Sequence, residues 1–163
     1  MRHIISILIE NEAGALSRVV GLFSARDFNI ESLTVAPTED SSLSRITLVT
    51  AGSDKIIEQI VKQLNKLIDV VKLVDLSDFE HVERELMLVK LNVKDSNQAE
   101  IIQIADIFRC RVLDVNKETI TIEATGRSSK LDALLNILDE EKIIEVARTG
   151  VCGLARGNHA LKV

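Results

Sequence analysis

The chain has 163 residues, 46% of them hydrophobic, which is enough for one ordinary domain or two small ones with apolar cores. A formal net charge of -5 and an aromatic content of 2% argue against nucleic-acid binding, which uses basic faces and stacking rings. The longest apolar runs, such as 4–9, are too short to span a bilayer, and nothing after Met1 resembles a signal peptide.

In the first half of the chain, short β-branched runs alternate with two helical stripes. Strands are predicted for residues 3–9, 29–36, 45–50 and 68–73. Between these runs, apolar residues recur at the spacing i, i+3, i+4, i+7, which places them along one face of a helix. The two stripes are Leu16, Val19, Val20 and Phe23, and then Ile57, Ile60, Val61 and Leu64. The predicted order is βαββαβ.

The second half repeats this order. Strands are predicted for residues 86–93, 111–115, 119–125 and 143–147, and helices begin near Gln98 and Ser128. The helical stripes are Ile101, Ile104, Ala105 and Phe108, and then Leu131, Leu134, Leu135 and Leu138. At a constant offset, Ile46-Thr47, Gly52 and Ile57 correspond to Ile120-Thr121, Gly126 and Leu131. The chain is therefore predicted to contain two tandem copies of one fold.

Two connected βαβ units with a central hairpin give a four-stranded antiparallel sheet with both helices on one face, because crossover connections are right-handed. The predicted fold class is α+β, with two tandem ferredoxin-like βαββαβ domains. We place the domains at residues 1–76 and 84–163, with a linker at residues 77–83. The runs 4–9 and 86–89 are apolar at nearly every position, so the uncovered sheet face or edge is expected to meet a second copy in a homodimer.

The sequence contains no converging acid, base, nucleophile or metal ligands that would indicate catalysis. His3, His81 and His159 lie far apart and are interpreted as solvated surface residues. Cys110 and Cys152 have no CxxC spacing, which favours reduced thiols and a cytoplasmic location. We therefore expect neither a catalytic site nor a metal site.

The C-terminal tail carries glycines and positive charge. Residues 150–157 lack the lysine and hydroxyl of a phosphate-binding loop and are predicted to form glycine-rich turns. Arg148, Arg156 and Lys162 are interpreted either as solvated or as contacts to a partner subunit.

The turn between the first strand and the first helix, residues 11–16, is a candidate anion-binding site. Backbone N–H groups at a helix N-terminus are unpaired and carry the positive end of the helix dipole, so they can receive a carboxylate. Gly14 lets a ligand approach without a Cβ in the way, and Asn11 offers both a donor and an acceptor. Asn29 can supply the same chemistry from the facing end or from a neighbouring subunit.

The spacing of Asn11 and Gly14 alone is weak evidence, because both residue types are common in ordinary turns and caps. The equivalent turn of the second repeat, residues 93–98, contains no glycine. This difference favours a special role for the first turn, although two copies can also diverge without one. A second anion-binding site of this kind is not expected in the second repeat.

Three segments of the chain resemble the small regulatory subunit family of acetolactate synthase, also called acetohydroxyacid synthase. They are residues 8–19 (LIENEAGALSRV), 28–38 (FNIESLTVAPT) and 145–150 (EVARTG). The resemblance extends from Met1 to about Gly157, which makes it far more specific than the short turn. It implies that the N-terminal half is an ACT domain, a ferredoxin-like module that binds amino acids between paired domains.

The resemblance also implies a role in branched-chain amino acid biosynthesis. The expected partner is a large catalytic subunit that uses thiamine diphosphate, magnesium and FAD, whereas this chain is expected to bind no cofactor. It would activate that subunit and confer allosteric feedback inhibition by valine, with only moderate discrimination against isoleucine or leucine. The effector-binding residues that the resemblance implies are Asn11, Ala13, Gly14, Ala15, Leu16, Asn29 and Ile30.

The residues alone leave three other functions to weigh. An RNA-binding module of this fold would need aromatic residues on its central strands and a basic sheet face, and both are missing. A small enzyme, such as a mutase or a nucleotide-binding kinase, would need a convergent catalytic set. An ACT-domain sensor that regulates a different enzyme or a transporter is excluded only by the long family resemblance.

Overall fold

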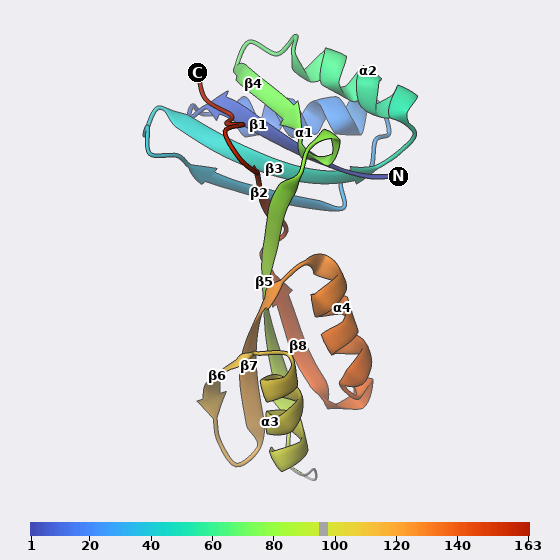
Figure 1. The fold of residues 1–163 in the computed structure, drawn as a ribbon, viewed down its shortest axis with the longest axis vertical. Coiled ribbons are helices and arrows are strands. Elements are labelled where there is room, and N and C mark those ends of the chain that lie inside the picture. Colours follow the sequence, from blue (N-terminus) through green and yellow to red (C-terminus); the bar gives the residue numbers. More distant parts are fainter. Residues whose placement is uncertain (95–97) are drawn as a thin grey trace. The chain divides into compact units, whose positions relative to one another are not determined.

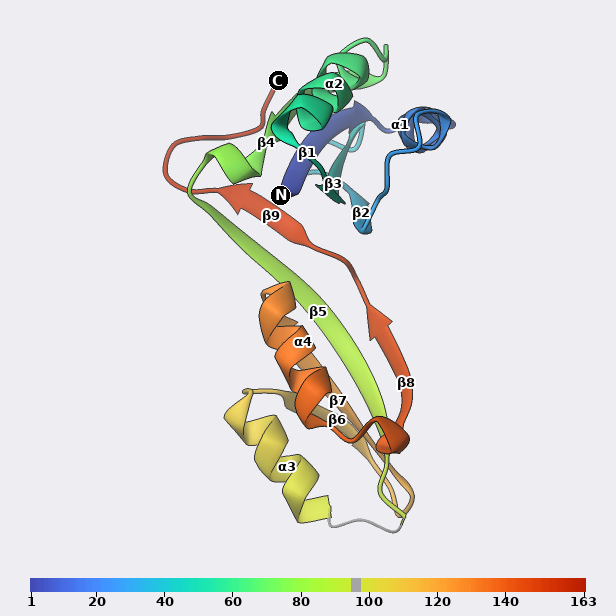
Figure 2. The same ribbon diagram turned by 90° about the vertical axis from the view of Figure 1, so that its right-hand side faces the viewer.

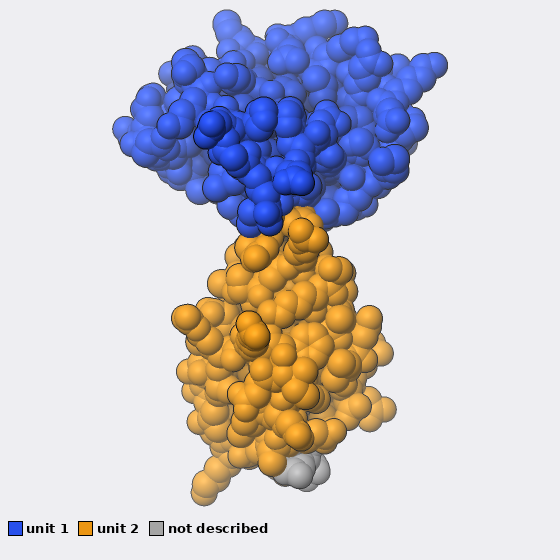
Figure 3. Space-filling view, viewed as in Figure 1, with its two compact units in different colours: residues 1–82, 151–163 blue, residues 83–150 orange. Residues whose placement is uncertain are grey.

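The computed structural model describes residues 1–94 and 98–163. These residues form two compact units: unit 1 comprises residues 1–82 and 151–163, and unit 2 comprises residues 83–150 (Figures 1 and 3). Each unit has the predicted order of strands and helices, which confirms the α+β class and the two ferredoxin-like domains. The predicted domain boundaries stay a prediction, and in the structure the tail after Gly150 packs with unit 1.

Unit 1 has a four-stranded antiparallel sheet. Its elements are β1 (Arg2–Glu10), α1 (Ala15–Ala25), β2 (Ser32–Pro37), β3 (Leu43–Ala51), α2 (Asp54–Leu64) and β4 (Val70–Asp75), followed by the 3-10 helix η1 (Leu76–Asp78). The strand order is β2-β3-β1-β4. The strands β1 and β3 are therefore central, whereas β2 and β4 form the two edges (Figure 1).

The central strand β1 is buried on both faces, from His3 to Ile9. Ile5 and Ile7 pack in a core with residues of the two helices, among them Phe23 of α1 and Ile60 of α2. Because side chains alternate across a strand, the residues between them face the opposite side of the sheet. One face of β1 therefore meets the helices, and the other needs a different cover.

The tail provides part of that second cover. On the face away from the helices, Ile4 and Val49 pack with Leu76 of η1 and with Val151. The residues after Val151 form β9 (Cys152–Ala155), which pairs with β5 (His81–Asn92) (Figure 2).

The prediction that residues 150–157 form only turns is wrong. This segment contains β9, because the apolar sheet face that the helices leave open gives a short strand something to pack against. Gly153 allows the close approach, since a Cβ there would lie 2.9 Å from Leu76 Cδ1.

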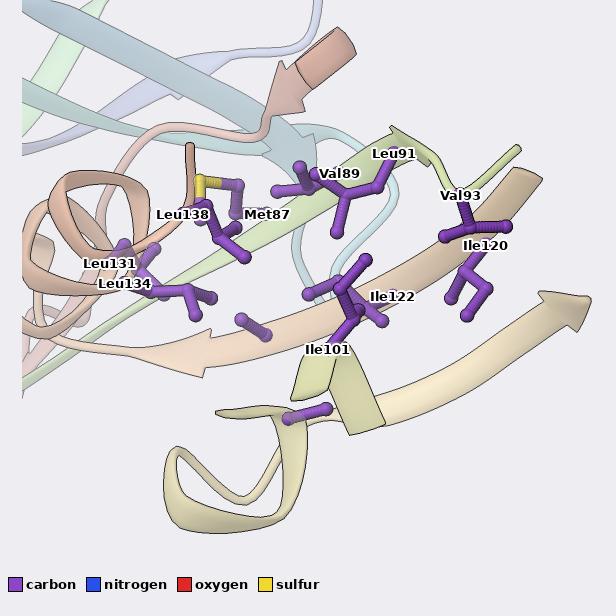
Figure 4. Packing of buried hydrophobic residues seen from close by; sticks show 12 residues of the cluster. Met87, Val89, Leu91, Val93, Ile101, Ile120, Ile122, Leu131, Leu134 and Leu138 are labelled. Carbon is purple, nitrogen blue, oxygen red and sulfur yellow. The ribbon is translucent and has the colours of Figure 1, made fainter. Parts of the chain in front are cut away.

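Unit 2 repeats the architecture. Besides β5, its elements are α3 (Gln98–Ile107), β6 (Arg111–Val115), β7 (Thr119–Gly126), α4 (Ser128–Ile137), the 3-10 helix η2 (Glu140–Lys142) and β8 (Ile143–Arg148). The strand order is β6-β7-β5-β8, which matches that of unit 1. Figure 4 shows Ile101 of α3 and Leu134 of α4 in the same cluster as Val89 of β5. None of the described helices is long and apolar enough to cross a membrane.

An ion pair fixes one end of the unit 2 sheet. Arg148 Nε and Nη2 donate to the Glu85 carboxylate at 2.8 and 2.9 Å, and Arg148 Nη1 donates to Asp132 at 2.7 Å. The Glu85 side chain is 5% exposed, and the hydrogen bonds from Arg148 lower the pKa of its carboxyl group. Arg148 thus makes ion pairs with two acidic residues of its own unit and stays exposed, and its interpretation as a solvated or partner-binding residue stays a prediction.

The interpretation of His3 as a solvated residue is also wrong. His3 is 6% exposed, and its Nδ1 lies 2.7 Å from Asp75 Oδ2. His3 is buried because it belongs to the central strand β1, together with the apolar residues that follow it. There the Asp75 carboxylate of β4 contacts the His3 ring. His159 remains exposed, and its ring lies 5.2 Å from that of Phe79.

Candidate functional site

The turn between β1 and α1 is built around a glycine in the left-handed region. Gly14 is the N-cap residue of α1, with φ 89° and ψ −14°. A residue with a Cβ is destabilised there by roughly 1–2 kcal/mol, so the backbone itself favours glycine. The next residue, Ala15, is 1% exposed and anchors the turn in the unit 1 core.

The N-terminus of α1 has no side-chain cap and no acidic residue in its first turn. The amide of Ala15 donates to the Glu12 carbonyl at 3.2 Å, whereas the amides of Leu16 and Ser17 make none of the described hydrogen bonds. These two donors lie at the positive end of the helix dipole. They are therefore suited to a carboxylate.

Arg18 occupies the space beside Gly14. A Cβ built on Gly14 would lie 2.9 Å from Arg18 Nη1 and 3.6 Å from its Cζ. Gly14 thus makes room for a guanidinium group of its own chain, where the sequence suggested open access for a ligand. Sequence reasoning missed Arg18, although its position four residues after Gly14 places both on one side of the helix.

Asp69 holds the Arg18 side chain in place. Arg18 Nε and Nη2 donate to the two carboxylate oxygens at 2.5 and 2.7 Å, and the Asp69 side chain is 4% exposed. The hydrogen bonds from Arg18 lower the pKa of the Asp69 carboxyl group. The pair therefore stabilises the fold above the ordinary aspartate pKa, and this contribution is lost as the pH falls through the lowered pKa. Arg18 Nη1 takes no part in the pair and lies next to Gly14.

Asn11 is fixed on the loop of residues 38–42, which joins β2 to β3. Its Nδ2 donates to the Ser41 carbonyl at 3.0 Å, and its backbone amide donates to the Ser42 carbonyl at 2.7 Å. Asn11 is exposed, and with this assignment of the amide its side-chain oxygen makes none of the described hydrogen bonds. That oxygen can accept a hydrogen bond from an ammonium group.

Asn29 lies at the other end of the same sheet. Its carbonyl accepts a hydrogen bond from Thr50 Oγ1 at 2.6 Å, and Thr50 pairs with His3 at the start of β1. Asn11, in contrast, follows the end of β1. Because a strand rises about 3.4 Å per residue, the stretch from His3 to Asn11 separates the two asparagines by about 27 Å within one chain.

The predicted site residues therefore fall into two groups. The structure brings together Asn11, Ala13, Gly14, Ala15 and Leu16 at one end of the sheet, and places Asn29 and Ile30 at the other. Leu16 and Ile30 are partly buried against the unit 1 core, whereas Ala13 is exposed.

The comparison of the Gly14 turn with its equivalent in the second repeat is only partly accessible in the structure. The contrast with the turn of the second repeat, residues 93–98, falls partly on residues 95–97, which lie outside the described residues.

Among the residues that the structure describes, no group of three or more His, Cys, Asp or Glu side chains is arranged to hold a metal ion.

Two family models match the chain. A model of the AHAS small subunit-like ACT domain matches residues 5–72, and a model of the small subunit of acetolactate synthase matches residues 84–157. Together with the ferredoxin-like fold and the turn at Gly14, these matches define the molecule as an ACT-domain protein with a second, small-subunit-type domain.

Full-length relatives are more specific. The chain is 52% identical over 163 residues to the acetolactate synthase isozyme 3 small subunit of Escherichia coli strain K12, covering 99% of this chain and 100% of the relative. It is 52% identical over 158 residues to the acetolactate synthase small subunit of Haemophilus influenzae, covering 96% and 97%. The crystal structure of the small subunit from Thermotoga maritima superimposes with a TM-score of 0.89 at 41% identity, covering 98% and 99%. The chain belongs to the acetolactate synthase small-subunit family.

The conformation of Gly14 can be tested through stability. Gly14→Ala is expected to lower the free energy of unfolding by about 1–2 kcal/mol, because alanine is strained at φ 89° and its Cβ would meet Arg18. Gly21, inside α1, is the matched control. A Cβ there would meet nothing within 4 Å, so Gly21→Ala is expected to stabilise by about 0.5–1 kcal/mol. Urea unfolding followed by circular dichroism measures the free energy of unfolding of both variants. Equal values for the two variants would contradict the left-handed conformation of Gly14.

Proposed function

We propose that this chain is the regulatory subunit of an acetolactate synthase in branched-chain amino acid biosynthesis. In this role it activates the thiamine-diphosphate-dependent catalytic subunit and makes it subject to feedback inhibition by valine. The observation that carries the proposal is the uncapped start of α1 at Gly14, with the Arg18 guanidinium beside it, in a member of the small-subunit family.

Catalysis and regulation belong to different subunits. Thiamine diphosphate, magnesium and FAD belong to the catalytic subunit, whereas this chain binds valine and has no catalytic site. It acts in the cytoplasm, without a membrane or nucleic acid partner. The domain at residues 1–76 senses the effector, and the domain at residues 84–163 stabilises the dimer or contacts the catalytic subunit.

The contacts to valine follow from its three chemical parts. Its carboxylate accepts hydrogen bonds from the amides of Leu16 and Ser17 and lies near Arg18 Nη1, and its ammonium group donates to the Asn11 side-chain oxygen. Leu16, together with Ile30 of a second copy, offers apolar surface to the branched side chain. One methylene separates valine from isoleucine or leucine, and it is worth roughly 1–3 kcal/mol in such a pocket.

A second copy would bring Asn29 to this turn. The strand β2 is an edge of the unit 1 sheet. When two such edges pair in antiparallel fashion, the start of one strand lies opposite the end of the other. The end of β2, at Pro37, leads into the loop that holds Asn11, so Asn29 of the second copy would approach the turn. The homodimer is therefore part of the proposed site.

Reconstitution with a large subunit tests the function. The chain is expected to co-purify with an acetolactate synthase large subunit, to raise its activity and to make valine inhibitory. Gly14→Asp places a negative charge against the α1 amides and is expected to keep the activation but weaken valine inhibition at least about tenfold. Gly21→Ala serves as the control with unchanged inhibition.

The same assay separates the alternative. If the chain neither binds nor activates the large subunit, yet still binds an amino acid in calorimetry, it is an ACT-domain sensor of a different enzyme or transporter. Retained valine inhibition in Gly14→Asp would place the effector site elsewhere.

Mixed dimers test whether the site is shared between two copies. Asn11→Ala and Asn29→Ala are each expected to lose valine binding as homodimers. A mixed dimer contains one Asn11→Ala chain and one Asn29→Ala chain. One of its two sites carries both substitutions and the other carries neither. The mixed dimer is therefore expected to bind half as many valine molecules as the wild-type dimer, at wild-type affinity. Calorimetry of a doubly tagged, purified mixed dimer measures the stoichiometry. If both asparagines acted within one chain, the mixed dimer would bind no valine.

Arg18→Gln tests whether the guanidinium recognises the carboxylate. Valinamide keeps the side chain and the ammonium group of valine but lacks the negative charge, so wild-type protein is expected to prefer valine about tenfold or more. This preference is expected to fall several-fold in Arg18→Gln and to be unchanged in Arg26→Gln, an exposed residue at the other end of α1. Equal weakening of both ligands would show that Arg18 acts only through the shape of the turn.

A further inference from the structure

Unit 1 contains an open cavity of about 800 Å³ on the sheet face that α1 and α2 leave uncovered. Residues of β1, β2, β3 and β4 form its floor, and residues of η1, β9 and the segment 159–163 form its other side. None of the residues 11–16 lines it. The cavity is therefore distinct from the turn at Gly14, although the loop of residues 38–42 that holds Asn11 also contributes to its lining.

The strand register places two cations across the cavity floor. Leu8 of β1 pairs with Arg45 of β3 on one side and with Lys72 of β4 on the other. All three residues line the cavity. Because adjacent strands lie about 4.8 Å apart, the backbones of Arg45 and Lys72 are separated by roughly 10 Å, with an apolar residue between them.

Neither cation has a carboxylate partner at ion-pair distance in the part of the chain that the structure describes. Arg45 Nη2 donates to the Gly153 carbonyl at 3.0 Å, and Lys72 Nζ donates to the Lys162 carbonyl at 2.9 Å. Arg45 Nε is buried and has no hydrogen-bond partner. The acidic residues Glu39 and Asp40 also line the cavity, and burial lowers the pKa of the Arg45 guanidinium.

The next row of the sheet adds buried hydroxyl groups. Ser6 of β1 pairs with Thr47 of β3, which pairs with Thr34 of β2. Thr47 lines the cavity and is 3% exposed. Ser6 is fully buried on the same face, and its Oγ has no hydrogen-bond partner. Ser6 does not line the cavity, so a ligand there does not reach its hydroxyl group. The unpaired guanidinium nitrogen of Arg45 is costly without an acceptor, which an anion or its bound water supplies.

Much of the remaining lining is apolar. Leu8, Leu76, Phe79 and Leu154 contribute to it. A fully hydrated anion such as phosphate would leave this surface in contact with water, whereas a carboxylate with a hydrocarbon chain would cover it.

We propose that this cavity binds an amphipathic monocarboxylate, with its carboxylate between Arg45 and Lys72 and its hydrocarbon chain over Leu8 and against Phe79 and Leu154. Binding replaces two neutral carbonyl acceptors with a charged one, and it fills apolar space beneath the tail.

A matched set of probes tests the proposal. Octanoate, 1-octanol and octylammonium share one chain length and differ in the charge of the head group. Amide chemical-shift titrations of the full-length protein are expected to show saturable octanoate binding at β1, β3, β4 and β9. Octanol and octylammonium are expected to bind at least about tenfold more weakly.

Substitutions to methionine test whether the positive charges of Arg45 and Lys72, and not only the shape of the cavity, contribute to octanoate binding. Arg45→Met is expected to reduce octanoate affinity about tenfold and to remove its advantage over octanol. Lys72→Met is expected to weaken octanoate binding about fivefold. Because this variant leaves the hydrogen bond between Arg45 and Gly153 in place, it tests the charge even if Arg45→Met displaces the tail. Lys55→Met, which removes an exposed cation of α2, is the control with unchanged affinity.

Three results would overturn the proposal. They are equal binding of the three probes, unchanged octanoate affinity in both Arg45→Met and Lys72→Met, and shifts confined to residues outside the cavity. Displacement of octanoate by valine would assign both ligands to one site and would also contradict it.

Discussion

The burial of β1 on both faces is the constraint on which the rest of unit 1 depends. A ferredoxin-like unit has helices on one side of its sheet only, yet residues from His3 to Ile9 are all withdrawn from water. Covering each large apolar side chain contributes about 1.5–3 kcal/mol, so the second face needs a partner as much as the first. The 3-10 helix η1 and the tail supply it. Besides the cavity on this second face, the edges and ends of the sheet remain for the recognition of other molecules.

The candidate effector site follows from this arrangement, because it lies where the central strand ends and the chain turns into α1. Its donors are backbone amides, which every sequence possesses, and what distinguishes them is the absence of a cap and the presence of Arg18. Asp69 fixes the guanidinium with a bidentate contact, so the positive groups are arranged before any ligand arrives. Preorganisation of this kind reduces the entropy that binding would otherwise cost. The distance to Asn29 is the reason that the proposed site includes a second copy of the chain.

Much of the fold could be predicted, because helical stripes such as Leu131, Leu134 and Leu138 and β-branched runs have different periods and the chain carries both twice. The strand β9 could not, since four residues between glycines show no period and their burial depends on a face formed elsewhere. The same reason explains why the burial of His3 and the ion pair of Arg148 could not be predicted, since their partners Asp75 and Glu85 are distant in sequence. Within the candidate site, Gly14 was identifiable from its residue type. The role of Arg18 required the structure, because an arginine on an exposed helix face is usually solvated.

Unit 1 is assembled from two separate stretches of the chain, with the whole of unit 2 between them. This arrangement affects the order in which the molecule is completed. On the ribosome, residues 83–150 form a continuous stretch that can fold when it emerges. The cover that Leu76 gives to Ile4 and Val49 stays incomplete until Val151 has emerged as well. The unit that is synthesised first is therefore completed last. A chain that stops short after unit 2 carries an unfinished first unit, so a truncation near its C-terminal end acts on the N-terminal core.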